Sequence, residues 1–205
     1  MAVSAMVAAA LTVGTPNARA ATATESAAAT SVFTLLNAER TAHKLPKLGV
    51  SLALATSAHN HNLAMAKANL LSHQLPGEHS LSQRISAVGV AWRYIAENVA
   101  WTTNRTITGA SAVHAAMYGE RPPNDGHRRN ILSTSARYVG IDVIIDSATG
   151  RLWLTEDFAD AAGPVPAAHK TVGHLNSATS AGNHRAQPPV RYAVSSRGPS
   201  NSDER

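Results

Sequence analysis

Residues 138–158 read YVGIDVIIDSATGRLWLTEDF, and this stretch decides the fold class. Residues 138–146 and residues 151–158 show a period of two in their apolar and polar side chains, and the linking residues 147–150 favour a turn. Such a pattern on both sides of a short turn predicts an antiparallel β-hairpin. The folded part of the chain is therefore expected to end in β-structure.

Helical patterns precede this hairpin. Apolar side chains recur with a period of 3.6 and follow serine or threonine residues that can cap a helix. The expected helices span residues 31–43, 51–71, 80–89 and 108–118. Ser31 is the expected cap of the first, and Ser80 with Gln83 fits a capping box for the third. Helices followed by antiparallel strands favour an α+β layer fold over a parallel doubly wound sheet.

Aromatic residues mark the limits of the domain, because eight of the nine lie between residues 31 and 160. We predict one domain over residues 31–160, preceded by a linker over residues 21–30. Residues 161–205 are rich in Pro, Gly, Ser and Asn and lack apolar periodicity, which predicts a disordered basic tail.

The N-terminal residues 1–20 are predicted to be a secretory signal peptide. Residues 2–13 form an apolar run too short to span a bilayer, and Ala18-Arg19-Ala20 has small residues where a signal peptidase cleaves. A positively charged start is missing, so an alanine-rich disordered leader is the alternative. The prediction implies a secreted, extracellular protein without a transmembrane segment.

Charge and cysteine content restrict the partners. Residues 31–160 contain 12 Lys and Arg against 10 Asp and Glu, and no basic run has interleaved aromatic residues. This near-neutral balance predicts that nucleic acid is not a partner. The chain has no cysteine, so it forms no disulfide. We expect a monomer.

Seven short motifs follow one another in a specific order. They are Leu36-Asn37-Ala38-Glu39-Arg40, Leu71-Ser72-His73, Ala96-Glu97-Asn98-Val99-Ala100-Trp101, Met117-Tyr118-Gly119-Glu120, Gly126-His127-Arg128-Arg129-Asn130-Ile131-Leu132, Val139-Gly140-Ile141 and Asp157-Phe158. The string resembles the CAP superfamily, the SCP-like domain shared by cysteine-rich secretory, antigen 5 and pathogenesis-related 1 proteins, most closely its cysteine-free bacterial branch. The resemblance implies a three-layer α-β-α sandwich with a mainly antiparallel central sheet.

The resemblance also implies a central cleft with two histidines and two acidic residues. Carried over by motif, these are His73, Glu97, Glu120 and His127. The sequence departs from the family pattern at Ala96, where glycine is usual, and at Met117, where an aromatic residue is usual.

These residue types suit a divalent cation. Two neutral imidazoles with nearby carboxylates can bind Zn²⁺ in an open site, with water completing the coordination. Glu97 is a candidate general base, but it can equally orient a histidine. Without an ion, His73 can cap helix carbonyls and the two glutamates can be a buried and a solvated acid. His59 and His61 point about 200° apart on a helix and cannot share an ion.

These features favour a secreted binding module with a divalent cation, expected to be zinc, in its cleft. As the resemblance implies, its partner would be a lipid, a cell-wall component or a protein such as one on a host surface. The alternative is a metal-dependent hydrolase, conceivably a peptidase, in which Glu97 is the base. A third possibility treats the four residues as a polar core and the tail as the attachment to a partner.

Overall fold

The structure, a computed structural model, describes residues 21–164. The predicted signal peptide and nearly all of the predicted tail lie outside this range. The elements occur in the order α1 (Ala23–Ala42), β1 (Gly49–Val50), α2 (Leu52–Ala68), α3 (Leu81–Ala87), β2 (Trp92–Thr102), α4 (Ile107–Tyr118), α5 (Gly126–Ile131), β3 (Tyr138–Asp146) and β4 (Arg151–Ala161).

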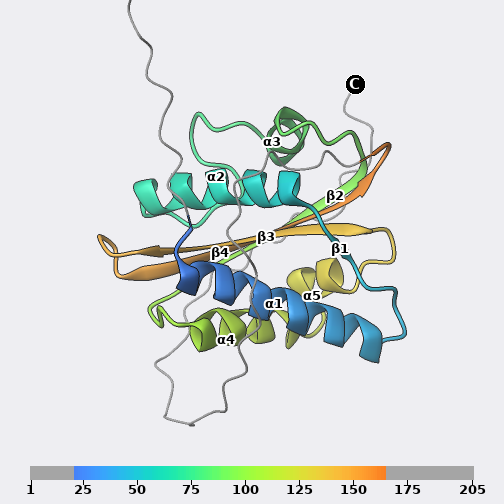
Figure 1. The fold of residues 1–205 in the computed structure, drawn as a ribbon, viewed down its shortest axis with the longest axis horizontal. Coiled ribbons are helices and arrows are strands. Elements are labelled where there is room, and N and C mark those ends of the chain that lie inside the picture. The colour runs from blue at the N-terminus through green and yellow to red at the C-terminus, as the bar shows by residue number, and fades with distance from the viewer. Residues whose placement is uncertain (1–20, 165–205) are drawn as a thin grey trace, which may run out of the picture.

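The elements form three layers, as predicted. A central sheet has the strand order β1-β3-β4-β2. Helices α2 and α3 cover one face, and α1, α4 and α5 cover the other (Figure 1). The pairs β3–β4 and β4–β2 are antiparallel, whereas the two-residue strand β1 pairs with β3 in parallel. The sheet is therefore mixed, and the α+β sandwich with mainly antiparallel pairing is confirmed.

The first helix begins earlier than predicted, so the expected cap at Ser31 is wrong. Thr22 is the N-cap: its hydroxyl accepts from the Glu25 amide (3.2 Å), and the Glu25 carboxylate accepts from the Thr22 amide (2.7 Å). Glu25 also accepts from the amide of Ile145 on β3 (2.6 Å), which fastens the helix to the sheet. Most of the expected linker, residues 21–30, is therefore helical.

The other predicted elements are found with small changes at their ends. Ser51 caps α2, which stops at Ala68 before the left-handed residue Asn69. The capping box of Ser80 and Gln83 opens α3. The predicted hairpin is β3 and β4, and β4 runs three residues further, to Ala161.

Strand β2 was not predicted. Residues Ile95–Ala100 are all buried, so this stretch lacks the alternation that marks a half-exposed strand. None of the helices in residues 21–164 combines the length and the apolar character needed to cross a bilayer.

The register between β2 and β4 positions the candidate site. Glu97 is paired with Asp157, and the next residue, Asn98, is paired with Glu156. Because successive side chains point to opposite faces of a sheet, the first pair faces one helical layer and the second pair faces the other. Strand β2 lies at an edge of the sheet, so its free side is available to other segments.

Candidate functional site

The structure brings the four predicted site residues together in two pairs. His73 lies in the connection between α2 and α3, and its Nδ1 is 2.7 Å from Oε1 of Glu97 on β2. His127 lies in the first turn of α5, and its Nδ1 is 2.6 Å from Oε1 of Glu120, which follows α4. Each histidine is therefore held by one of the two predicted glutamates.

Glu97 is fully buried and is held by a cation as well as by His73. The Arg84 Nη2 donates to its Oε2 (2.7 Å) and to the backbone carbonyl of His73 (3.1 Å). Burial opposes ionisation of Glu97, but the hydrogen bond from His73 and the charges of Arg84 and His61 outweigh it and lower its pKa to about 2. Glu97 is consequently a carboxylate at neutral pH.

The ionised Glu97 fixes the orientation of the His73 ring. A carboxylate only accepts hydrogen bonds, so the hydrogen of a neutral His73 ring lies on Nδ1 and the lone pair lies on Nε2. Glu120 holds His127 in the same way and also accepts from the His127 backbone amide through Oε2 (3.0 Å). In this neutral tautomer each histidine directs an acceptor nitrogen, Nε2, away from its glutamate.

Two asparagines connect these pairs across the free side of β2. The side chain of Asn130 on α5 donates to the Glu97 carbonyl (3.3 Å) and to Oδ1 of Asn98 (2.9 Å). Asn98 in turn donates to the carbonyl of His127 (3.4 Å). Helix α5 is thus fastened to β2 beside Glu97.

The Nε2 atoms of His73 and His127 are both buried and have no hydrogen-bond partner among the described residues. An unsatisfied buried acceptor is costly, which makes these atoms the candidates for binding an ion. However, the four residues predicted to bind the cation, His73, Glu97, Glu120 and His127, do not all face one common point as ligands. Within residues 21–164, no three His, Asp or Glu side chains form a group that could hold a metal. Both Nε2 atoms are also inaccessible to solvent.

Two residues at the site were not predicted from the sequence. Arg84 gave no signal beyond a helical position. Asp157 belongs to a recognised motif, but its position opposite Glu97 depends on the unpredicted strand β2. Burial and the charge of Glu97 raise the pKa of Asp157 well above its usual value. Burial and the neighbouring carboxylate thus favour the protonated form of Asp157 next to Glu97.

His61 belongs to the same helical layer and links α2 to the loop that carries His73. Its Nε2 lies 2.8 Å from the carbonyl of Ser72, and its Nδ1 lies 2.7 Å from Oε1 of Glu78. His59 instead contacts Asp142 (3.1 Å), so the two histidines of this helix have separate partners.

A second polar cluster lies on the opposite face of the sheet. His114 of α4 is buried between two carboxylates, with Nδ1 2.6 Å from Glu156 and Nε2 2.9 Å from Glu39. Burial opposes its protonation, but the two glutamates outweigh burial and raise the pKa of His114 to about 10. Glu156 also accepts from Asn98 (2.9 Å), so this imidazolium supports the strand that carries Glu97.

The His114 cluster makes stability depend on alkaline pH. The native state holds the proton more tightly than the unfolded chain, so the contribution is complete below about pH 6.5 and is lost as pH rises toward about 10. This contribution to the free energy of unfolding is on the order of 5 kcal/mol. Urea unfolding across this range should show a gap between the protein and its His114→Gln variant that narrows as pH rises. A gap of constant size would mean that His114 is not charged.

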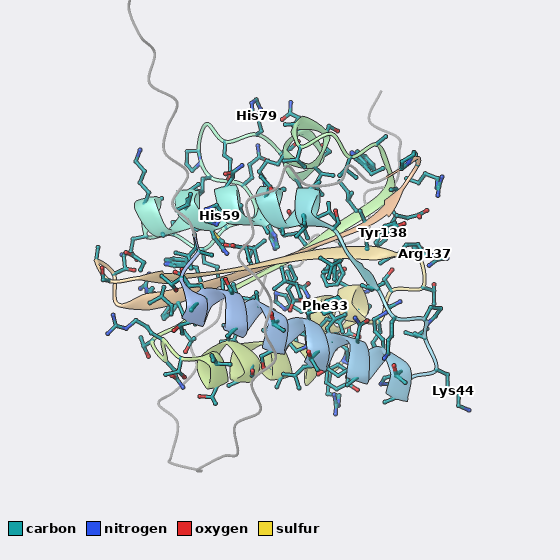
Figure 2. All side chains as sticks on the ribbon, viewed as in Figure 1. Phe33, Lys44, His59, His79, Arg137 and Tyr138 are labelled. Atoms are coloured by element: carbon teal, nitrogen blue, oxygen red, sulfur yellow. The ribbon has the colours of Figure 1, made fainter. Side chains whose placement is uncertain are left out.

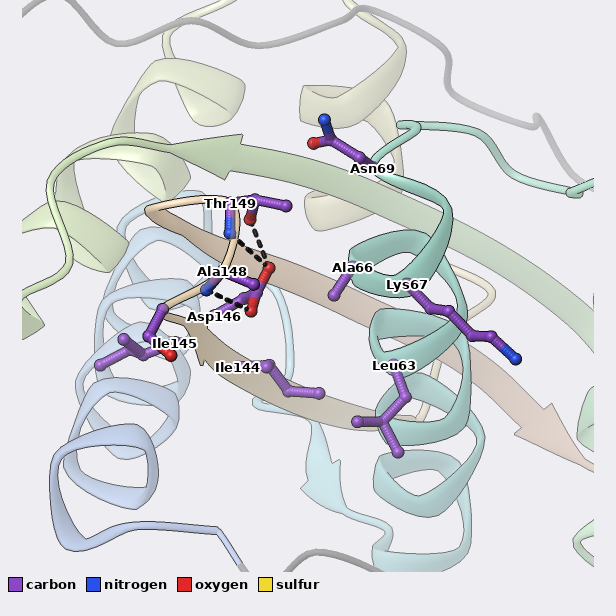
Figure 3. A pocket seen from close by; sticks show the side chains of 10 residues that line it. Leu63, Ala66, Lys67, Asn69, Ile144, Ile145, Asp146, Ala148 and Thr149 are labelled. Atoms are coloured by element: carbon purple, nitrogen blue, oxygen red, sulfur yellow. Dashed lines mark hydrogen bonds between the residues drawn. The ribbon is translucent and has the colours of Figure 1, made fainter.

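The structure also has a hollow of about 420 Å³ between the end of α2 and the β3–β4 turn (Figure 3). Leu63, Lys67 and Ile144 line it, and the carboxylate of Asp146 at its edge accepts from the amides of Ala148 and Thr149. None of the predicted site residues lines this hollow, so it is separate from the candidate site.

Comparisons with known proteins agree with the fold and the motifs. The chain is 29% identical over 127 residues to the uncharacterized protein YkwD of Bacillus subtilis, an alignment that covers 62% of this chain and 45% of that protein. The chain thus spans less than half the length of this relative.

Two solved structures share the fold. An extracellular protein containing a SCP domain from Bacillus anthracis matches with a TM-score of 0.56 and 24% identity, covering 66% of this chain and 41% of that one. An outer surface protein of Borrelia burgdorferi matches with a TM-score of 0.57 and 15% identity, covering 65% of this chain and 92% of that one. The family model of CAP, the cysteine-rich secretory protein family, matches residues 33–158, and the chain belongs to this family.

Proposed function

We propose that this chain is a secreted binding module in which His73 and His127 hold one divalent cation, expected to be zinc. The observation that carries the proposal is the pair of buried Nε2 atoms without a partner among the described residues, each on a ring whose Nδ1 faces a glutamate. Zinc-binding histidines commonly donate their other ring nitrogen to a carboxylate, which fixes the tautomer and strengthens the ligand.

The roles of the four residues follow from these contacts. His73 and His127 would supply the nitrogen ligands, and Glu97 and Glu120 would position the rings. Water or a bound partner would complete the coordination, since a zinc site with few protein ligands keeps positions open. Because both nitrogens are buried, loading requires a local movement of side chains.

Binding is favoured over hydrolysis by the state of Glu97. A general base needs a pKa near the working pH and a free oxygen facing the water that it deprotonates. The pKa of Glu97 is about 2, and its two oxygens face His73 and Arg84. These properties suit an orienting carboxylate and argue against the role of catalytic base.

Secretion is supported by the sequence and by the relatives. Residues 1–20, with an apolar run over residues 2–13 and small residues at Ala18 and Ala20, have the features of a cleaved leader. Proteins with this fold include an extracellular protein and an outer surface protein. The partner would therefore be an extracellular lipid, wall component or protein.

A zinc titration of the full chain tests the site. We expect one zinc per chain, and His73→Ala or His127→Ala should weaken its binding at least about 100-fold, because each removes one of two nitrogen ligands. His79→Ala is the matched control: His79 is exposed on the outer side of the α2 and α3 layer (Figure 2). Equal zinc binding by all three variants would eliminate the proposed site.

The variant Glu120→Gln tests whether Glu120 orients the His127 ring or binds the zinc ion directly. The amide oxygen of glutamine can still accept from His127, so zinc affinity should fall by about 10-fold to 100-fold while the one-to-one stoichiometry persists. A loss as large as that in His127→Ala would instead identify Glu120 as a ligand.

A further inference from the structure

The acidic side chains of residues 21–164 are buried or partly buried, and most of them bond to groups of the protein itself. Residues 21–164 contain eleven Asp and Glu, and none of their side chains is exposed. Most of them have partners described above, including Glu25 at a helix start, Glu97 beside Arg84 and Glu156 beside His114. The carboxylates therefore contribute little negative charge to this surface.

The basic residues have the opposite distribution. Of the twelve Lys and Arg in the same range, only Arg40 and Arg84 are buried, and eight are exposed. The exposed residues are Lys44, Lys47, Lys67, Arg93, Arg105, Arg121, Arg129 and Arg137. A domain that is almost neutral overall therefore presents mainly positive charge to its surroundings, which attracts anionic partners.

Several of these cations gather at one end, where the loop after α1 meets the loop before β3. Lys44 and Arg137 extend from this end (Figure 2). Arg40 holds the two loops together by donating to the carbonyls of Pro46 (2.9 Å) and Ser133 (2.9 Å), and the Gly49 amide donates to the Arg137 carbonyl (2.9 Å). We call Lys44, Lys47, Arg137 and the adjacent Val50 and Leu52 the basic end.

The charges of the basic end are not neutralised by acidic side chains. Within residues 21–164, no carboxylate forms an ion pair with Lys44, Lys47 or Arg137, whereas Arg93 and Arg129 pair with Asp160 and Asp125. The chain also leaves β4 here, because the Arg137 amide donates to the Ala159 carbonyl (2.9 Å). In the sequence, residues 165–205 contain five Lys and Arg against two Asp and Glu.

Apolar side chains accompany these cations. Val50 is 56% exposed and Leu52 is 41% exposed, and Val50 pairs with Val139, two residues after Arg137. Exposed aliphatic groups beside cations are typical of proteins that lie on anionic bilayers. A single-stranded nucleic acid would instead require aromatic stacking platforms, and every Trp, Tyr and Phe in the described range is buried or partly buried.

We propose that the basic end is a docking surface for an anionic lipid bilayer. Lys44, Lys47 and Arg137 contact the phosphate-bearing head groups, and Val50 and Leu52 enter the interface between head groups and acyl chains. This surface is independent of the proposed zinc site, so removing the metal does not change membrane binding.

Vesicle sedimentation with the full chain tests the proposal. We expect binding to phosphatidylcholine vesicles that contain phosphatidylglycerol, weakening with added salt, and none to pure phosphatidylcholine. Lys44→Glu/Lys47→Glu should weaken binding at least about 30-fold, since each cation near such a surface contributes about fivefold. The matched control, Lys67→Glu/Arg105→Glu, changes the net charge equally at the opposite end and should weaken it by less than about threefold. Thermal melting checks that both variants are folded, and Lys44→Gln/Lys47→Gln is the milder second pair.

Further measurements identify the kind of anion and the independence from zinc. Val50→Ser should weaken vesicle binding roughly fivefold. EDTA should have no effect. Equal loss in both charge-reversed pairs, or no loss in either, would overturn the proposal, because diffuse charge or the tail would then be responsible. It would also fail if the protein bound soluble polyphosphate but not vesicles, or if EDTA abolished vesicle binding.

Discussion

Replacing Gly140 with alanine is expected to destabilise the protein by about 3 kcal/mol or more, because β3 crosses α2 at this residue without room for a side chain. An added Cβ would lie 2.1 Å from the Ala55 amide nitrogen and 2.2 Å from the Leu54 carbonyl carbon. Both are backbone atoms, so the helix and the sheet must move apart. Thermal unfolding should show a fall in Tm of roughly 10 °C.

Gly163→Ala is the control for this prediction. A Cβ at Gly163 would meet nothing within 4 Å, so the melting temperature should not change. If Gly140→Ala also melts like the unsubstituted protein, then α2 does not lie against β3 as closely as described, and the position of His61 on α2 is contradicted as well.

Replacing Arg84 with leucine is expected to cost about 3 to 5 kcal/mol of unfolding free energy, because it leaves the buried Glu97 carboxylate without its cation. The pKa of Glu97 should then rise. With Arg84 present, the low pKa stabilises the native state above about pH 4.5, and this contribution is lost as pH falls toward about 2. In Arg84→Leu, a native pKa of Glu97 above its unfolded value would make the variant more stable as pH falls. The difference in unfolding free energy between the unsubstituted protein and the variant should therefore narrow as pH falls from neutral. Urea unfolding at several pH values measures both effects.

A double variant tests whether Arg84 stabilises the protein by compensating the Glu97 charge or only by filling space, and a variant of an exposed ion pair is the control. Arg84→Leu/Glu97→Gln should recover part of the loss, because it removes the uncompensated charge. Arg93→Leu breaks an ion pair with Asp160 in which the arginine side chain is 61% exposed, and it should have little effect. A double variant less stable than Arg84→Leu would show that the guanidinium acts mainly by filling space.

The fold was largely predictable because several local signals agree with it. Ser51 and Ser80 are caps in the sequence and in the structure, and the period-two stretches around residues 147–150 form the hairpin. The start of α1 differs from the expectation although Thr22 and Glu25 have capping-box spacing, because the alanine-rich residues 21–30 also fit the composition of a linker. Alanine is also the strongest helix former.

The site was only partly predictable, because its contacts join distant segments. The motifs identified His73, Glu97, Glu120 and His127, but not which histidine each glutamate holds. Arg84 reaches Glu97 only because α3 packs on the same face of the sheet. Buried strands such as β2 lack a periodic signal, so the position of Asp157 beside Glu97 could not be inferred.

Surface charge was the least predictable property. The net charge of residues 31–160 is nearly zero, and this balance predicts only that nucleic acid is not a partner. Composition does not reveal which charges are buried. Glu97, Glu156 and Asp157 are buried, and this leaves the exposed lysines and arginines in excess.

The most direct test of the zinc site is a crystal structure of the zinc-loaded protein with anomalous scattering at the zinc edge. We predict one peak about 2.0 to 2.1 Å from Nε2 of both His73 and His127, with Glu97 and Glu120 still bonded to Nδ1 of the rings. A peak bound to only one of these histidines, or to neither, would contradict the account.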